Sequence, residues 1–218
     1  MSAPRRRSRL FTTSAFGALA LAALWAAPAQ AQLVQGATPA QSNGTGPTID
    51  QSVPNTTTVT LGGSRTVIDW DKFDINGGDT ANFVFANRSD IVLNRVGGAA
   101  STINGNLNGT IGSAGGTAGG NIWIYNANGV VIGANARIST GGLLVTTAAI
   151  DRATDSSAGG FLDGSSTQFG FTGASSDAGI TVRNGAQITS HGGAIALVST
   201  SVTTEAGSSI SAQDGGNV

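Results

Sequence analysis

The sequence predicts an all-β fold, a parallel β-helix. Three observations lead to this prediction. Glycine supplies 33 of the 218 residues and only 11% of residues are charged, a composition typical of short strands joined by tight turns. Brief apolar or alternating runs end repeatedly at Asn-Gly or Gly-Gly. A 22-residue repeat near the C-terminal end places Ile188 and Ile210 at equivalent positions.

The repeat defines the expected architecture. Residues 185–188 with 192–195 are echoed by residues 207–210 with 215–218, and an earlier copy begins at residue 135. Each unit offers one apolar strand that cannot bury itself alone, so stacked units supply the core. An immunoglobulin-like sandwich is the alternative, but it would have longer alternating strands and fewer glycines. No capping pattern follows the last unit, so we expect the natural protein to continue beyond Val218.

The first 31 residues are predicted to form a signal peptide. Four arginines precede an apolar run over residues 10–27, and Ala29-Gln30-Ala31 has the small-x-small pattern of a cleavage site. We expect cleavage between Ala31 and Gln32. A membrane anchor is the alternative, but the run is rich in Ala and Gly and ends in a cleavage motif. The chain is therefore expected to be exported.

Charge and cysteine content narrow the classes of partner and fold. Four of the 11 basic residues lie in the predicted leader, so seven basic and 12 acidic residues follow it. Nucleic acid is disfavoured as a partner because phosphate binding requires a basic patch. The chain contains no cysteine, so its stability has to come from its core and backbone hydrogen bonds.

The chain then divides into a lead-in and a series of short strands. Residues 32–55 contain Pro39, Pro47 and Pro54 among small polar residues, which predicts an extended, weakly ordered lead-in. Regular structure is expected to begin at Thr56. The first predicted strands cover residues 56–61, 65–70, 71–75, 82–85 and 91–96, and most are closed by glycine-containing turns.

The middle of the chain is also assigned to strands and turns. Ile103, Leu107 and Ile111 have helical spacing, but each intervening glycine would cost a helix about 1 kcal/mol, so they are assigned to successive rungs or turns. Residues 113–120 are expected to be a loop. Residues 121–150 are predicted to form two or three buried strands, on which the rest of the chain is organised. Residues 151–160 are polar and predict a surface excursion.

Several motifs in order carry a resemblance to a known family. They are residues 67–75 (VIDWDKFDI), residues 92–96 (VLNRV) with Gly98, residues 101–107 (STINGNL) and residues 126–130 (NANGV). This order resembles the secretion domain of filamentous haemagglutinin-type adhesins, the exported proteins of two-partner secretion systems. The resemblance extends from about Thr56 to Val218. The family motif usually reads Asn-Pro-Asn-Gly-Ile, so Ala127 and Val130 depart from it, and Ala127 should make the turn less rigid.

The resemblance implies a right-handed, single-stranded β-helix with an N-terminal cap and extra-helical hairpins. It implies recognition in the periplasm by an outer-membrane barrel transporter with periplasmic domains, followed by folding outside a Gram-negative cell. The parent protein would be an adhesin or a contact-dependent toxin that meets a host or neighbouring cell surface, with no enzyme activity and no cofactor. The implied recognition motif is Asn126, Ala127, Asn128, Gly129 and Val130. The family motif residues expected to be structural are Asp69, Trp70, Phe73, Asn94, Arg95, Val96 and Gly105.

The turn at residues 126–129 supports two interpretations. Asparagine side chains can bond nearby backbone and Gly129 can adopt positive φ, so the turn could hold adjacent coils in register. The transporter could also grip the same segment while it is extended, and the two roles are compatible. Arg95 follows Asn94 in an apolar strand, where a buried guanidinium would need several acceptors that backbone carbonyls of a neighbouring coil could provide. We expect this structural role, and contact with a partner is the alternative.

An enzymatic alternative rests on clustered carboxylates. Asp69, Asp71 and Asp74 are the candidates, because polysaccharide-active β-helix enzymes use such clusters with calcium or arginine. Asp69 and Asp71 would share a strand face. No third ligand at calcium-loop spacing is visible, which disfavours this alternative. His191, the sole histidine, is assigned to a turn without a triad or metal partner, and Gly77-Gly78-Asp79 is assigned to a turn.

Overall fold

A computed structural model describes residues 34–35, 41–166, 169–173 and 178–218. These residues form strands and turns, with no helix among them. The predicted signal peptide, including Ala31 and Gln32, lies outside the described residues. In the part of the chain that the structure describes, no helix is long and apolar enough to cross a membrane.

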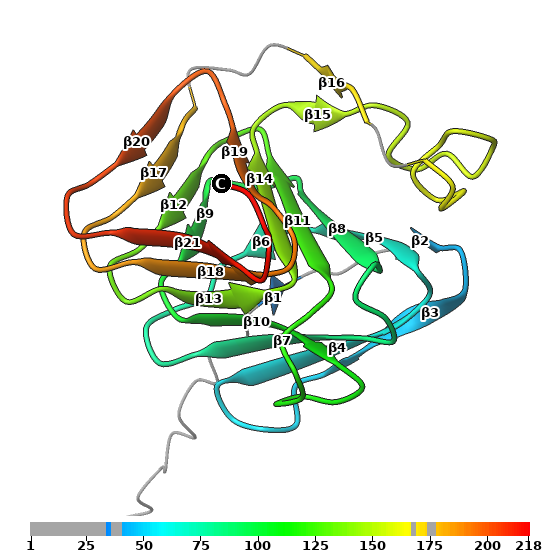
Figure 1. The fold of residues 1–218 in the computed structure, drawn as a ribbon, viewed down its shortest axis with the longest axis horizontal. Coiled ribbons are helices and arrows are strands. Elements are labelled where there is room, and N and C mark those ends of the chain that lie inside the picture. The colour runs from blue at the N-terminus through cyan, green and yellow to red at the C-terminus, as the bar shows by residue number, and fades with distance from the viewer. Residues whose placement is uncertain (1–33, 36–40, 167–168, 174–177) are drawn as a thin grey trace, which may run out of the picture.

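Three sheets form the walls of a parallel β-helix (Figure 1). The seven-stranded wall contains β3 (Thr45–Asp50), β4 (Thr56–Gly62), β7 (Thr80–Phe85), β10 (Asn106–Ile111), β13 (Arg137–Thr140), β18 (Gln187–His191) and β21 (Ser209–Gln213). The six-stranded wall contains β2 (Gln41–Ser42), β5 (Arg65–Trp70), β8 (Ile91–Val96), β11 (Asn121–Asn126), β14 (Gly142–Thr146) and β19 (Ile195–Val198). The four-stranded wall contains β9 (Ser101–Ile103), β12 (Val130–Ile132), β17 (Ile180–Val182) and β20 (Val202–Thr204).

The chain visits the three walls in turn, so neighbouring strands within a wall come from successive coils. Their registers align side chains of the same kind on the inside. In the six-stranded wall, one such inward row consists of Val92, Ile122, Leu143 and Ile195, which pair in sequence and are all buried. Burying a side chain of this size stabilises a fold by about 1.5–3 kcal/mol. The stacked rows therefore supply the core that no single coil could form.

Most of the predicted strands are confirmed. β5 and β8 have the predicted bounds, β4 extends one residue further, and β7 begins two residues earlier. The apolar residues at 103, 107 and 111 lie in β9 and β10 rather than in a helix. Ile188 pairs with Ile210, as the 22-residue repeat predicts. The strand predicted over residues 71–75 is shorter, since only β6 (Lys72–Phe73) forms and Ile75 makes an isolated bridge to Ile103.

The prediction that regular structure begins only at Thr56 is wrong. β2 and β3 precede that residue and pair antiparallel with β5 and β4, so they cover the first strands of two walls. β1 (Val34–Gln35) pairs antiparallel with β6. Asn43, between β2 and β3, is hydrogen-bonded to β5 of the six-stranded wall. Its main-chain amide donates to Arg65 O, and its Oδ1 accepts from Arg65 N. The lead-in is extended, as predicted, but it is an ordered cap.

One insertion interrupts the coils between β14 and β17, and we call it the excursion (residues 147–179). Within it, β15 (Ala149–Ile150) pairs antiparallel with β16 (Phe171–Thr172), and Figure 1 shows this pair outside the walls. Residues 151–160 form surface turns, as predicted, but Phe161 and Leu162 are buried. They pack against Val67 and Leu93 on the outer face of the six-stranded wall. The excursion therefore has its own small apolar core.

Candidate functional site

The segment Asn126 to Val130 connects the end of β11 to the start of β12. Gly129 N donates to Asn126 O at 3.1 Å and Gly129 has φ 102°, a backbone conformation that favours glycine. Asn126 Oδ1 accepts from Asn128 N at 2.9 Å, which closes an Asx turn inside the backbone turn. The predicted turn is therefore present, and its two asparagines and glycine each have a defined backbone role.

This turn is bonded to the coil before it and to the coil after it. Asn126 Nδ2 donates to Ala99 O at 2.9 Å and to Ser101 Oγ at 3.0 Å. Asn128 Nδ2 donates to Gly98 O at 2.6 Å. On the other side, Val130 N donates to Gly179 O at 3.1 Å. Asn126 has no exposed surface, so a polar side chain sits inside the helix with its donors satisfied.

Five of the seven family motif residues lie in β5 and β8 of the six-stranded wall, whereas Phe73 lies in β6 and Gly105 lies between β9 and β10. Trp70, Phe73, Asn94 and Val96 point into the core, where Trp70 and Phe73 ring centroids are 5.9 Å apart. Trp70 Nε1 donates to Asn94 Oδ1 at 2.9 Å, and Asn94 Nδ2 donates to Trp123 O at 3.1 Å. This buried pair satisfies the polar atoms that its position would otherwise leave unpaired.

The expectation for Arg95 is wrong in its partner. Arg95 lies on the outside of the wall with its side chain 31% exposed, and it forms a bidentate ion pair with Asp69, with Nε and Nη2 each 2.6 Å from a carboxylate oxygen. Asp69 and Arg95 are register partners on adjacent strands, so alternation places both outside. The Asp69 carboxylate, and not backbone carbonyls of a neighbouring coil, therefore accepts the hydrogen bonds of the Arg95 guanidinium.

The candidate carboxylates are brought together only in part. Asp69 and Asp71 line one hollow of about 270 Å³, together with Arg95 and Tyr125. Asp74 is bonded elsewhere, accepting from Thr102 N at 2.6 Å and pairing with Lys72 at 3.1 Å. Among the described residues, no group of three or more His, Cys, Asp or Glu is placed to hold a metal ion. The described part of the hollow therefore combines the Asp71 carboxylate with the Asp69–Arg95 ion pair.

His191 differs from its prediction in position and in surroundings. It is the last residue of β18, and its Nε2 is 3.2 Å from Ser139 Oγ while its Nδ1 is 3.8 Å from Asp214 Oδ2. The second distance is too long for a hydrogen bond, and the Asp214 side chain is 71% exposed. The three groups resemble a triad in composition, but the carboxylate does not orient the imidazole.

Two glycines of the motif region are required by close approach. A Cβ on Gly105 would lie 2.3 Å from Asn76 O and 2.4 Å from Asp79 O, and one on Gly98 would lie 2.0 Å from Asp71 O. Gly78 has φ 93° and Asp79 N donates to Asn76 O, so the predicted turn there is confirmed.

Sequence reasoning missed an aromatic cluster between the excursion and the six-stranded wall. The rings of Trp123, Phe161 and Phe169 are mutually 5.5–5.6 Å apart, and Arg65 Cζ lies 5.9 Å from the Phe161 centroid. Arg65 is 7% exposed, and burial lowers the pKa of its guanidinium, which Asp90 partly offsets. Three phenylalanines among the polar residues 151–173 are the signal that could have predicted this contact.

The fold and the motif geometry define a parallel β-helix domain with a capped first coil. A family model for the TPS secretion domain, the domain of two-partner secretion, matches residues 27–217. The chain belongs to the TPS secretion domain family. The crystal structure of the HMW1 secretion domain from Haemophilus influenzae is similar with a TM-score of 0.59 and 23% identity, over 78% of this chain and 41% of that chain.

Two curated proteins are also similar in sequence. A Heme/hemopexin-binding protein of Haemophilus influenzae is 33% identical over 111 residues, which is 50% of this chain and 11% of that protein. The protein of the same description from strain ATCC 51907 / DSM 11121 / KW20 / Rd is 33% identical over 113 residues, or 51% of this chain and 10% of that protein. The matched segment thus spans about a tenth of these relatives.

Family membership has consequences for partner and location. Proteins that carry this domain are secreted through the periplasm to the cell surface or the extracellular space, and the organism of the relatives implies a Gram-negative source. The domain also implies an outer-membrane transporter as partner.

Proposed function

We propose that this chain is the N-terminal secretion domain of an exported filamentous adhesin or haemagglutinin-like protein. An outer-membrane barrel transporter with periplasmic domains recognises the segment Asn126 to Val130, and the domain then nucleates β-helix folding at the cell surface. The segment 56–218, with the cap before it, is the functional unit, and it continues into a longer protein. Family membership supports the secretion role.

The burial of Asn126 is the observation that carries this proposal. In the folded coil, Asn126 has no exposed surface and bonds to Ala99, Ser101 and Asn128. A transporter can reach this side chain only before the coil has formed. Recognition therefore precedes folding, and the same side chain locks two coils together once the segment has been released outside. The structural and recognition roles of the turn follow one another in time.

The cap supports a nucleating role for the N-terminal coils. β2 and β3 pair with β5 and β4 and satisfy edges that would otherwise offer unpaired backbone to another chain. Each later coil then adds to a template that is closed at one end. This order suits a chain that emerges progressively from a pore, since each coil contacts mainly its neighbours.

The activity of the parent protein is proposed to lie outside this segment. The curated relatives are named for binding heme and hemopexin, and the match spans about a tenth of their length. We place the adhesive or toxic activity toward a host or neighbouring cell surface beyond Val218. The domain itself acts without enzyme activity and without a cofactor.

Export across the outer membrane tests the proposal. The chain is expressed with and without a co-expressed partner barrel, and its amount in the medium is measured for the wild type and for Asn126→Ala/Asn128→Ala. We expect barrel-dependent export of the wild type, reduced at least tenfold by the double substitution. Refolding of the purified double variant from urea, followed by circular dichroism, separates a recognition defect from a folding defect.

Thr140→Val is the matched control for folding. Thr140 is also fully buried, and its hydroxyl donates to Gly120 O at 3.0 Å and Gly142 O at 3.3 Å, but it lies outside the turn. We expect this variant to lose stability and keep its export. Equal export of every variant, or export without the barrel, would contradict the proposal. Degradation of uronate polymers that Asp71→Asn abolishes would favour the enzymatic alternative.

A further inference from the structure

The outer face of the six-stranded wall carries an apolar row. Its members pair in register across successive strands and are Val67, Leu93, Trp123, Leu144 and Ala196. Such a row on an outward face requires a cover, because the opposite faces of these strands already supply the core. The excursion provides that cover for the first coils, where Val67 and Leu93 have 1% and 0% exposure beneath Phe161 and Leu162.

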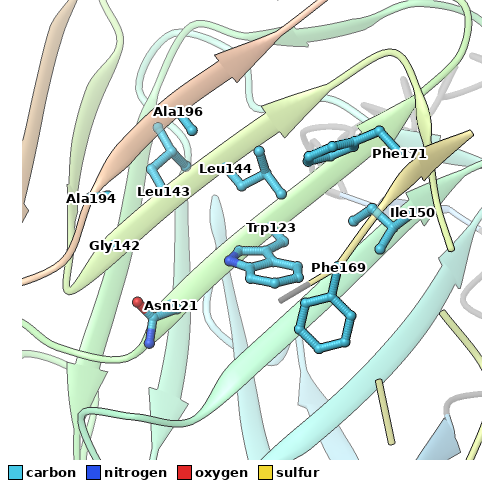
Figure 2. Close-up of a pocket in the computed structure, with 10 residues that line it drawn as sticks. All are labelled: Asn121, Trp123, Gly142, Leu143, Leu144, Ile150, Phe169, Phe171, Ala194 and Ala196. Carbon is cyan, nitrogen blue, oxygen red and sulfur yellow. The ribbon is translucent and has the colours of Figure 1, made fainter. Parts of the chain in front are cut away.

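The cover is incomplete over the later coils. Trp123 and Ala196 remain partly exposed, and a pocket of about 300 Å³ opens between this part of the wall and the β15–β16 pair. Figure 2 shows Trp123 and Leu144 on the wall facing Ile150, Phe169 and Phe171 of the excursion. Phe171 is 43% exposed at the rim. The pocket is thus built by two elements and lined by three aromatic side chains.

Among the described residues that line the pocket, none is charged and one, Asn121, has a polar side chain. Both hydrogen bonds described for this side chain are donated by Nδ2, to Arg88 O at 3.0 Å and to Asp90 O at 3.1 Å. These bonds fix the amide, and its Oδ1 accepts no hydrogen bond among the described residues. The pocket therefore presents aromatic and aliphatic walls with one oriented acceptor at one end.

We propose that this pocket binds a small, uncharged aromatic molecule of about two fused rings that carries one N–H or O–H donor. The volume lies at the lower end of the range for ligand pockets, which limits the size of the ligand. Aromatic walls favour a planar apolar body, and Asn121 Oδ1 receives its single donor. The inference is independent of the secretion role, since it concerns the folded domain and residues outside the turn.

Other small ligands fit the lining less well. A fatty acid would bury a carboxylate in a pocket whose described lining residues include no cation. A sugar would bring several hydroxyl groups to a site whose described lining has one polar side chain, and most of them would be left unpaired. An apolar peptide segment is the remaining class of occupant, and the experiment distinguishes it.

Indole and 1-methylindole are the probes, because they share one bicyclic ring and a methyl group replaces the N–H donor in the second. Each is titrated into the intact folded chain while the indole Nε1–H resonance of Trp123 is followed by nuclear magnetic resonance. We expect indole to bind with a Kd on the order of 0.1–1 mM, as suits a ligand of this size. Without its donor, 1-methylindole should bind about tenfold more weakly.

Two substitutions that introduce the same side chain, phenylalanine, at different places test the location of the binding site. Ala196→Phe fills the pocket from the wall and should weaken indole binding at least tenfold, whereas Ser211→Phe, on the outer face of the seven-stranded wall, should leave it unchanged. Phe171→Ala removes an exposed wall and should weaken binding without affecting the fold.

Three outcomes would overturn the inference. The first is that the Trp123 resonance does not shift up to about 10 mM indole, which is far above the Kd expected for this ligand. The second is that the two probes bind equally well. The third is that Ala196→Phe does not alter the shifts. Binding of a short leucine-rich peptide at Trp123, with no binding of indole, would identify a protein segment as the occupant instead.

Discussion

Gly105 lies where the backbones of two coils approach each other closely. Its Cβ would meet the carbonyl oxygens of Asn76 and Asp79 at 2.3 and 2.4 Å, and neither is a flexible group. We expect Gly105→Ala to destabilise the fold by about 1–3 kcal/mol, because the two coils must separate to admit a methyl group. The midpoint of urea unfolding measures this. Gly46→Ala is the control, since nothing lies within 4 Å of the added carbon, and an equal loss there would contradict the argument.

The buried pair Trp70 and Asn94 makes a second prediction at the residue scale. Trp70→Phe should cost about 1–3 kcal/mol, because Asn94 Oδ1 loses its donor in a site without solvent. Adding Asn94→Leu to Trp70→Phe should recover part of the loss, because the orphaned amide is then removed. A double-mutant cycle in urea measures the coupling. Additive losses would mean that the hydrogen bond contributes nothing.

The sequence alone could not predict which residue of a neighbouring coil a given side chain contacts. The sequence places Arg95 in a strand, but its partner Asp69 is 26 residues away and becomes a neighbour only through coil register. His191 and Ser139 are 52 residues apart for the same reason. The turn from Asn126 to Gly129 was predictable because its Asx bond and positive φ are local.

The excursion is held by its aromatic anchor. Phe161 is fully buried against Trp123 and Phe169, whereas Phe171 is 43% exposed. Phe161→Ala should lower the free energy of local unfolding of the excursion by about 3 kcal/mol or more. The coils should stay folded. We expect tryptic cleavage after Arg152 to accelerate at least tenfold, with an unchanged circular dichroism spectrum. Phe171→Ala is the matched control, and similar acceleration in both variants would show that Phe161 is not the anchor.

The stability of the excursion should also depend on pH, because of the Asp155 carboxylate. Ser157 hydrogen bonds, from hydroxyl and amide at 2.7 Å, and the Arg152 guanidinium lower the pKa of Asp155 from 3.8 to about 2. A lowered folded-state pKa means that the stabilisation is complete above the unfolded value and is lost as pH falls through the folded one. We therefore expect amide protection in residues 152–160 to decrease between about pH 4 and pH 2.

Asp155→Asn serves as the control for that titration. The variant should show weaker protection at pH 5 and a smaller change on acidification, with the remaining change due to Asp163, whose pKa the Ser165 hydroxyl lowers. Hydrogen exchange measured by mass spectrometry resolves this segment. An identical acid response in the wild type and in Asp155→Asn would assign it to other groups.

At the scale of elements, sequence predicted strands that are framed by turn residues and missed those defined by pairing. β5 and β8 have their predicted bounds because apolar runs end at glycine or at polar turns. β3 contains Gly46 and Pro47, which weaken any local strand signal, and it exists because β4 offers a free edge. The 22-residue repeat indicated the architecture because that separation aligns Ile188 with Ile210. The preceding coil contains the excursion and separates Ile138 from Ile188 by 50 residues, so the 22-residue spacing is visible only in the last coil.

The whole molecule is a stack of coils with a cap over its first coil. At the start, antiparallel strands cover the first strands of two walls, whereas the later coils are joined only by parallel pairing. Removing residues 41–50 would leave β4 and β5 as open edges of parallel sheets. Such edges recruit strands from other chains. Loss of the cap should therefore both destabilise the fold and promote association between chains.

We expect the chain without residues 41–50 to unfold at lower urea concentration and to form oligomers, detected by size-exclusion chromatography with light scattering. Ile49→Ser is the control, because it removes the exposed apolar side chain of β3 and keeps its backbone pairing with Val59. This variant should remain monomeric. If both variants oligomerise, the apolar side chain rather than the open edge controls assembly. A monomeric deletion variant with an unchanged midpoint would show that the cap is dispensable, and the template for coil addition would then have to lie in β4 and β5 themselves.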